Sequence, residues 1–170
     1  MYQNKRNRRT IYIVIPQGFT LQGEQARKLK RRTGVIISTF AYFRKYYNSQ
    51  IIPKYLHKAH MWARSKALEN IERGVDPVII NNSNMPRWHM YPYARMAFRR
   101  EYWVKFIEMK DTWNVSLEEL ERRGGGTIPL PILEDMKESY EPVRHVYDVL
   151  NDKYSRRKWI GSKEMTSNDW

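Results

Sequence analysis

The sequence has 170 residues, with 31 Lys or Arg against 18 Asp or Glu, so its formal net charge is +13. Hydrophobic residues make up 41% of it, which excludes a disordered chain and allows one ordinary domain with a buried core. Cysteine is absent, which excludes disulfide frameworks, thiolate metal sites and cysteine nucleophiles. The longest apolar run, residues 11–15, is too short to span a membrane, so we expect a soluble intracellular protein, nuclear or cytoplasmic, without a membrane partner.

The basic residues are concentrated near the start of the sequence. Residues 1–32 contain nine Lys or Arg and a single acidic residue, Glu24, and we expect residues 1–9 to form a flexible basic arm. A positive field of this kind attracts phosphate backbones, which makes RNA or DNA a candidate partner. A nuclear-import signal or a solvated surface explains the same charge, and the sign of the charge does not separate these interpretations.

Apolar runs without polar alternation indicate strands that are buried on both faces. Residues 11–15 predict the first strand, residues 35–37 predict the second, and helix formers at 22–32 predict a helix between them. Residues 53–73 carry small apolar side chains near helical spacing, and they predict a long helix that ends at Gly74.

Strands and helices continue to alternate along the rest of the chain. The predicted elements are a strand at 78–80, a helix at 85–99, a strand at 102–107, a helix capped by Ser116 and Glu119 that ends at Arg123, a helix at 132–140 and a strand at 146–150. This alternation predicts an α/β fold with a mostly parallel five-stranded sheet and helices on both faces, formed by residues 10–150. Residues 151–170 are expected to form a polar, partly disordered tail.

A set of spaced motifs runs through the middle of the sequence. They read Ala59-His60-Met61-Trp62, then Arg64, Ala67 and Gly74, then Pro77-Val78-Ile79-Ile80-Asn81-Asn82-Ser83-Asn84, then Trp88, Met90, Pro92 and Tyr93, and finally Phe106, Glu108, Thr112, Trp113, Glu119-Leu120, Arg122-Arg123, Met136 and Tyr140-Glu141. Over residues 10–150 this pattern resembles the polynucleotide-kinase-like P-loop domain of the Nedd-four-binding-protein-like family. The resemblance implies the three-layer sandwich of P-loop kinases.

The phosphate loop of that family, G-x-x-G-x-G-K-[ST], falls on residues 16–23 and is degenerate here. The positions that differ or carry the argument are Pro16, Gly18, Phe19, Leu21, Gln22 and Gly23. Pro16 has no N–H, and Phe19 and Leu21 bring side chains where the loop needs glycine to present its N–H groups to phosphate oxygens. Gln22 replaces the lysine charge, and Gly23 lacks the hydroxyl that would hold magnesium.

The acidic positions of the family are also lost. The resemblance implies two aspartates that activate the acceptor hydroxyl and help to hold metal, and this sequence has Phe40 and Ala41 there. The aspartate of the third strand is Asn81, which is neutral and can neither take a proton nor pair with a cation. We therefore expect no cofactor, no metal and no catalysis, and we interpret the chain as a pseudoenzyme of the P-loop kinase class.

Several polar residues remain as candidate phosphate or nucleic-acid contacts. They are the lid arginines Arg122 and Arg123, the asparagines Asn82 and Asn84, and Arg27, Lys28 and Arg31 of the first helix. The lid arginines also fit an exposed helix end, which we favour, and the asparagines also fit helix caps. His57 and His60 lie three apart on a helix, but no cysteine or carboxylate cluster completes a metal site.

Aromatic and basic residues mix most densely at residues 40–47. The aromatic members are Phe40, Tyr42, Phe43, Tyr46 and Tyr47, with Arg44 and Lys45 among them. Such residues stack on single-stranded bases or bind protein partners, but we favour core filling of the volume that lost nucleotide contacts leave. Phe19, Leu21, Phe40 and Phe43 are the candidates to fill that volume.

Three functional hypotheses follow. The leading hypothesis is a catalytically inactive P-loop kinase-like domain that acts as a binding or scaffolding module for a protein partner. The first alternative is a nucleic-acid-binding protein that uses the basic arm and the ancestral substrate groove. The second alternative is an active polynucleotide or nucleoside kinase with a rearranged site, because a fold does not by itself determine a function.

Overall fold

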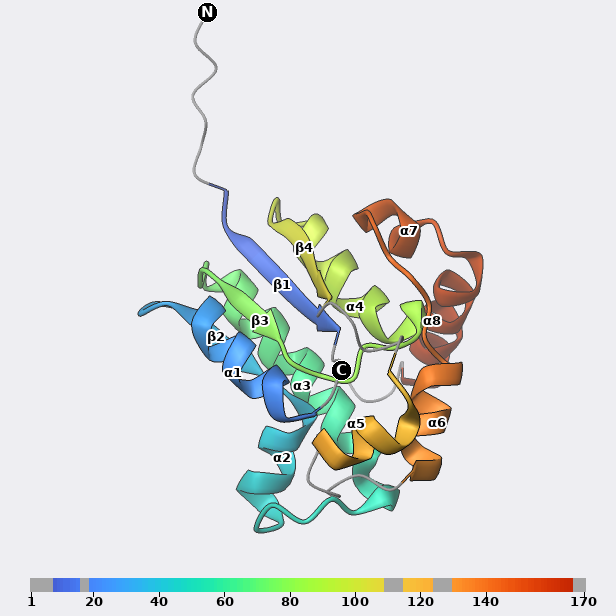
Figure 1. The fold of residues 1–170 in the computed structure, drawn as a ribbon. Helices are drawn as coiled ribbons and strands as arrows, with labels where there is room; N and C mark the ends of the chain where they lie inside the picture. The colour runs from blue at the N-terminus through green and yellow to red at the C-terminus, as the bar shows by residue number, and fades with distance from the viewer. Residues whose placement is uncertain (1–7, 16–18, 109–114, 124–129, 167–170) are drawn as a thin grey trace, which may run out of the picture.

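The structure, a computed structural model, describes residues 8–15, 19–108, 115–123 and 130–166. For residues 19–22, 123, 132 and 162–166 the description is limited to the backbone. Within these ranges the centre of the fold is a parallel sheet of four strands in the order β2-β3-β1-β4 (Figure 1). The strands are β1 (Thr10–Ile15), β2 (Val35–Ile37), β3 (Val78–Ile80) and β4 (Trp103–Glu108). All four correspond to predicted strands.

Helices connect and follow the strands. In chain order they are α1 (Phe19–Lys30), α2 (Thr39–Tyr46), the short 3₁₀ helix η1 (Pro53–Tyr55), α3 (Leu56–Glu72), α4 (Arg87–Phe98), α5 (Leu117–Arg123), α6 (Leu130–Glu138), α7 (Val146–Leu150) and α8 (Lys153–Thr166). The predicted long helix at 53–73 is η1 followed by α3. It ends as expected at Gly74, which adopts a φ of +74° and donates its N–H to Ile71 O over 3.0 Å.

Both faces of the sheet are covered by helices, as the alternation predicts. Ile11, Ile13 and Ile15 of β1 pack with the small side chains of α3 and α4 in the larger core cluster. Val14 points to the opposite face and packs with Ala26 of α1. Successive side chains of a strand point to opposite faces of the sheet, and both faces are buried here. This explains why the strand at 11–15 is apolar at every position and does not alternate with polar residues.

The predicted fifth strand at 146–150 is wrong, because these residues form helix α7. A capping box starts this helix: the His145 side chain accepts a hydrogen bond at its N-terminus, and the Asp148 carboxylate accepts from the His145 N–H over 2.9 Å. Val149 on α7 is fully buried in the larger core cluster. A short segment with apolar residues at 146, 147, 149 and 150 is compatible with either structure, and the cap favours the helix.

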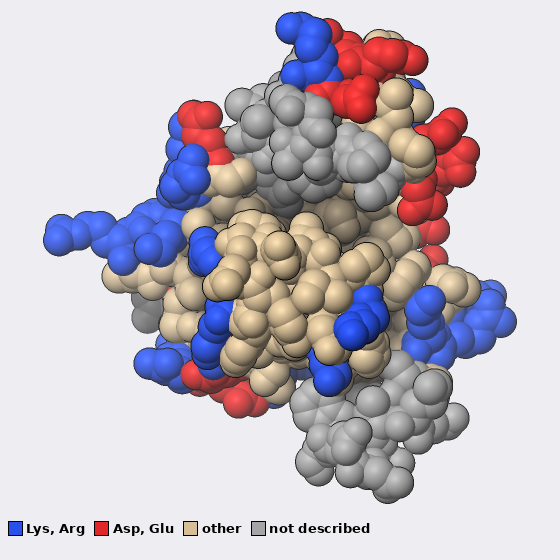
Figure 2. All heavy atoms as spheres, turned by 90° about the horizontal axis from the view of Figure 1, so that it is seen from below, with Lys and Arg blue, Asp and Glu red and all other residues tan. Residues whose placement is uncertain are grey.

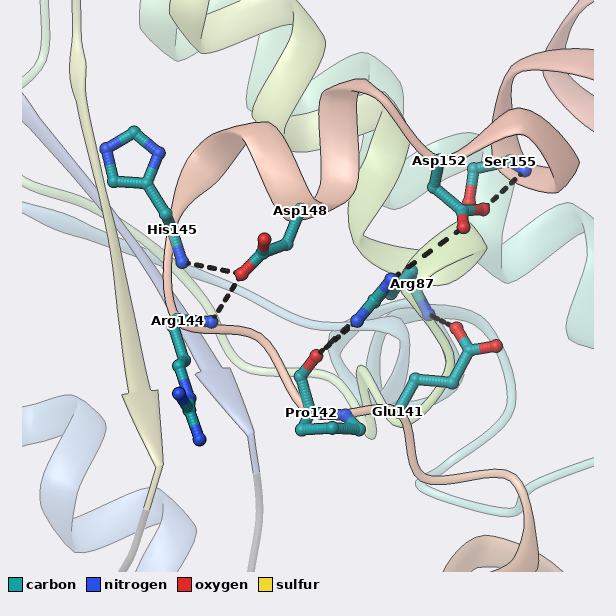
Figure 3. Close-up of polar contacts among 8 residues, drawn as sticks. All are labelled: Arg87, Glu141, Pro142, Arg144, His145, Asp148, Asp152 and Ser155. Carbon is teal, nitrogen blue, oxygen red and sulfur yellow. Dashed lines mark hydrogen bonds and ion pairs between the residues drawn. The ribbon is translucent and has the colours of Figure 1, made fainter.

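Within the predicted polar tail, residues 153–166 form α8, which packs against α4 (Figure 1). A polar network holds this C-terminal region in place (Figure 3). The Glu141 carboxylate accepts from the Arg87 N–H over 2.7 Å at the first residue of α4, and the Arg87 guanidinium donates to Pro142 O over 2.9 Å. Asp152 lies 3.9 Å from the same guanidinium and accepts from the Ser155 N–H over 2.8 Å at the start of α8.

The last two residues of the predicted basic arm lie against the sheet. Arg9 O accepts a hydrogen bond from the Trp103 N–H over 2.8 Å, and the Arg8 guanidinium lies 5.1 Å from the centre of the Trp103 ring. The remainder of the arm, residues 1–7, lies outside the described residues. None of the described helices is long and apolar enough to cross a membrane.

Candidate functional site at the carboxyl edge of the sheet

All four strands run in the same direction, so their carboxyl ends meet at one edge of the sheet, where α/β folds place their ligands. β1 ends at Ile15 and α1 begins at Phe19. Four of the positions assigned to the degenerate phosphate loop, Phe19, Leu21, Gln22 and Gly23, therefore belong to a helix. The other two, Pro16 and Gly18, lie outside the described residues, as do the side chains proposed to fill the site at 19 and 21.

Asn82 and Asn84 follow β3 at this edge, and both are buried. The Asn82 side chain accepts from the Thr39 N–H over 2.8 Å and donates to the Tyr93 hydroxyl over 3.2 Å, so it links β3 to α2 and α4. Burial raises the pKa of Tyr93 to about 12, which keeps its hydroxyl protonated. Asn82 thus bonds to the first N–H of a helix, but the helix is α2 and not the following α4.

The Asn84 side chain joins the two central strands. Its Nδ2 donates to Val14 O of β1 over 2.8 Å and to Ile80 O of β3 over 3.3 Å. Its φ is +37°, which asparagine tolerates better than most residues. The described contacts connect both asparagines to neighbouring strands and helices, and in these contacts neither side chain caps the helix that follows it, α4.

The positions of the lost acidic residues lie beside these asparagines. Phe40 and Ala41 are in the first turn of α2, where the Ala41 N–H donates to the Ser38 hydroxyl over 3.2 Å. Phe40 is 44% exposed, so it does not fill the core as expected, whereas Phe43 is buried. The Asn81 N–H donates to Ile37 O over 2.8 Å, and Asn81 Oδ1 is buried without a hydrogen-bond partner in the described part of the chain.

The other candidate contacts are not brought together at this edge. Arg27 and Lys28 lie in the last turn of α1, and Arg31 follows it, about 12 to 18 Å along the helix from its start at 1.5 Å per residue. Lys28 pairs with Glu24 over 2.9 Å. Arg122 is exposed and donates to both oxygens of Glu119 within its own helix, and the side chain of residue 123 lies outside the description.

Aromatic residues of α2 and η1 form a partly exposed group in which Tyr46 is exposed and Tyr42, Tyr47 and Tyr55 are half-buried. We call it the aromatic–basic surface; it consists of Tyr42, Tyr46, Tyr47 and Tyr55 with Lys45, Lys54 and Lys58. Tyr47 stacks on Tyr55 with ring centres 5.0 Å apart, and the Lys54 ammonium lies 4.9 Å from the Tyr55 ring. Figure 2 shows the end of the molecule that carries α2, where uncharged residues occupy the middle and Lys and Arg, together with some Asp and Glu, lie around them.

A second group, of basic side chains that are distant in the sequence, lies between α3, α4 and α8. We call His60, Arg64, His89 and Lys158 the Arg64 cluster. The His60 and His89 rings are 5.6 Å apart, and the Lys158 ammonium lies 3.7 Å from the ring of Trp88, beside His89. The sequence suggests only a pairing of His60 with His57 on the same helix. Nothing in the sequence indicates that α3 lies beside α4 and α8.

Burial and mutual repulsion hold the two imidazoles neutral. Burial, then the charge of Arg64 and His57, lower the pKa of His60 to about 4. Burial, then His60, Arg64 and Lys158, lower the pKa of His89 to about 4. Burial also lowers the pKa of Arg64 from its usual range. Among the described residues no group of three or more His, Asp or Glu side chains could hold a metal ion.

Comparison with known proteins supports the fold. The chain is similar to NEDD4-binding protein 2 of Homo sapiens, with 35% identity over 135 residues, which are 77% of this chain and 8% of that protein. A chain of the Pnkp1/Rnl/Hen1 RNA repair complex matches 91% of this chain and 47% of its own length, with a TM-score of 0.61 and 13% identity. The chain has a P-loop kinase-like fold.

A gluconokinase from Sinorhizobium meliloti 1021 shares the fold as well, with a TM-score of 0.50 and 13% identity over 91% of this chain and 97% of that chain. No protein-family model matches the sequence. The predicted α/β class and the similarity to a NEDD4-binding protein are therefore confirmed, with four strands in the described sheet in place of the predicted five. This P-loop kinase-like domain spans only a small part of its human relative.

Proposed function

We propose that this P-loop kinase-like domain is catalytically inactive and acts as a binding module. The observation that carries the proposal is the short connection between β1 and α1. Only residues 16–18 separate the end of β1 from the start of α1, and the helix already includes five positions, 19–23, of the eight-residue phosphate loop. A helical backbone directs its N–H groups along the helix axis, so it cannot curl around a phosphate as the loop does.

The chemistry of the neighbouring positions supports the same proposal. Phe40 and Ala41 carry no carboxylate, and Asn81 offers a neutral amide in the place of the third-strand aspartate. Phosphoryl transfer depends on electrostatic stabilisation and on metal ions that carboxylates hold, so these losses act on the same step. The name of NEDD4-binding protein 2 agrees with a protein partner for this domain.

Phosphoryl transfer is the direct test. The purified chain is incubated with γ-labelled ATP, Mg²⁺ and either a 5′-hydroxyl oligonucleotide or a nucleoside, with an active polynucleotide kinase in parallel as the positive control. We expect no labelled acceptor above the protein-free reaction. Label on either acceptor, at a rate that follows the concentration of the chain, would support the rearranged active kinase instead.

A second candidate function rests on the aromatic–basic surface. Tyr46 is 52% exposed, and the Lys45 ammonium lies 5.1 Å from its ring, so an aromatic face and a positive charge are offered together. Bases of single-stranded nucleic acid stack on such rings, and lysines attract the backbone that joins the bases. We propose that this surface contacts the nucleic acid in addition to the ancestral groove.

Filter binding of single-stranded RNA and DNA across a salt series tests this second function. Tyr46→Ser should lower the affinity, by about 1–3 kcal/mol if one base stacks there. Tyr147→Ser is the matched control, because Tyr147 is 49% exposed but lies on α7. Binding that is weak, insensitive to salt and equal in both variants would contradict the nucleic-acid function.

A further inference from the structure

The Arg64 cluster concentrates positive charge in a place where proteins seldom leave it without a counter-charge. Arg64 is half-buried, its Nε has no hydrogen-bond partner in the described part of the chain, and burial lowers its pKa. A buried guanidinium without a carboxylate is destabilising, because its lost hydration is not replaced. Perturbed charged groups of this kind cluster at functional sites, so Arg64 is a candidate contact for an anionic ligand.

The neighbours of Arg64 add donors of the same kind. His60 lies four residues before Arg64 on α3, so the two side chains share one face of the helix. His89 comes from α4, with its ring centre 5.6 Å from that of His60, and its Nδ1 is buried without a partner among the described residues. Lys158 comes from α8 and lowers the pKa of His89 through its charge. Three helices therefore supply one guanidinium, one ammonium and two imidazoles.

These groups match one class of ligand. A tetrahedral oxyanion accepts from a guanidinium and from imidazole N–H groups together, and a dianion balances the two fixed charges of Arg64 and Lys158. We propose that the Arg64 cluster binds a dianionic phosphate group, either inorganic phosphate or a terminal phosphate monoester. The site is formed by α3, α4 and α8, which are different elements from β1 and α1, where a triphosphate would sit in an active relative.

A phosphate titration followed by thermal unfolding tests the site. Inorganic phosphate should raise the Tm of the chain in a saturable way, beyond chloride at equal ionic strength. Arg64→Met should weaken the phosphate affinity by about tenfold or more, since it removes a charged hydrogen-bond donor. Arg44→Met is the matched control, because Arg44 is exposed on α2. Equal phosphate affinity in the two variants would overturn the proposal.

The stability of Arg64→Met without phosphate separates a binding role from a structural role. Removing a half-buried cation whose Nε lacks a partner among the described residues should leave the stability unchanged or raise it, whereas removing a structural group should lower it. A stable variant with weakened phosphate binding supports the site. A destabilised variant that binds phosphate as the original chain does would assign Arg64 to the fold and overturn the proposal.

The imidazole resonances give a measurement that needs no variant. NMR titration of His60 and His89 with and without phosphate should show both pKa values rising when phosphate is present, because an anion stabilises their protonated forms. His60 is influenced by Arg64 and His57, which lie on the same helix, α3. His89 is influenced by His60 and Arg64 of α3 and by Lys158 of α8. Two pKa values that do not respond to phosphate would overturn the proposal.

Oligonucleotides then identify the source of the phosphate. A 5′-phosphorylated oligonucleotide that displaces inorganic phosphate, when its 5′-hydroxyl counterpart does not, supports a nucleic-acid end as the ligand. Displacement by neither oligonucleotide supports a small phosphate compound. Equal displacement by both would show recognition of phosphodiesters, which contradicts the proposed dianion. These outcomes are independent of phosphoryl transfer from ATP, so the inference and the proposed function fail separately.

Discussion

At the scale of single residues, the amides at the carboxyl edge of the sheet are fixed by the strands that they join. Asn84 is 1% exposed, and its Nδ2 is shared by carbonyl oxygens of β1 and β3. The register of β1 with β3 ends at Ile13 and Ile80, so the Asn84 side chain lies just beyond the last paired residues of these two strands. The side chain therefore replaces a main-chain donor, which explains why a polar group is tolerated at this depth.

Asn84→Ala should destabilise the chain by about 2 kcal/mol or more. Two carbonyl groups lose their donor, and alanine tolerates the positive φ at this position less well than asparagine does. Asn151→Ala is the control, since Asn151 is exposed at the end of α7. Urea denaturation measures both. Equal midpoints for the two variants would show that the Asn84 hydrogen bonds contribute little.

The two buried histidines make the stability depend on pH. Their folded pKa of about 4 lies below the ordinary value of 6.5, so between these values the unfolded chain binds protons that the folded chain does not. Stability should therefore fall as the pH drops from 6.5 towards 4. In His60→Gln the loss over this window should be smaller than in the original chain. An identical pH profile for the unfolding midpoint would contradict the assigned pKa.

At the scale of helices and strands, the sequence predicts an element well where only one of the two, a strand or a helix, would bury all of its apolar residues. The apolar runs at 11–15, 35–37 and 78–80 are strands because both faces of each are covered. Residues 146–150 are apolar apart from Asp148 but form a helix, because His145 and Asp148 cap it. Residues 153–166 are polar on average, and the packing of α8 against α4 depends on tertiary contacts that no local pattern contains.

Gly74→Ala should destabilise the end of α3 by about 1 kcal/mol or more, because a Cβ there combines a positive φ with a close contact. The added Cβ would lie 2.8 Å from Cζ of Arg9. Gly161→Ala is the matched control, since a Cβ at Gly161 in α8 meets nothing within 4 Å and alanine favours a helix. A Tm for Gly74→Ala as high as that of Gly161→Ala would contradict this account of the helix end.

At the scale of the whole molecule, the sequence predicts the fold more completely than the site. The spaced motifs indicate a P-loop kinase-like domain, and the comparisons agree. The degenerate loop is visible in the residues themselves, but the early start of α1 at Phe19 and the outward position of Phe40 depend on packing. The Arg64 cluster brings together residues of three helices. Its first and last members, His60 and Lys158, are 98 positions apart in the sequence, so no local pattern could reveal the cluster.

The most direct test of the account is a crystal of the chain soaked with ATP and Mg²⁺. We predict no nucleotide density between Ile15 and Gly23, because a three-residue connection and the start of α1 occupy the positions of the phosphate loop. Phosphate density at the Arg64 cluster is compatible with that result. A triphosphate seated between Ile15 and Gly23, with Mg²⁺ on its oxygens, would contradict the central claim that this P-loop kinase-like domain has lost its nucleotide site.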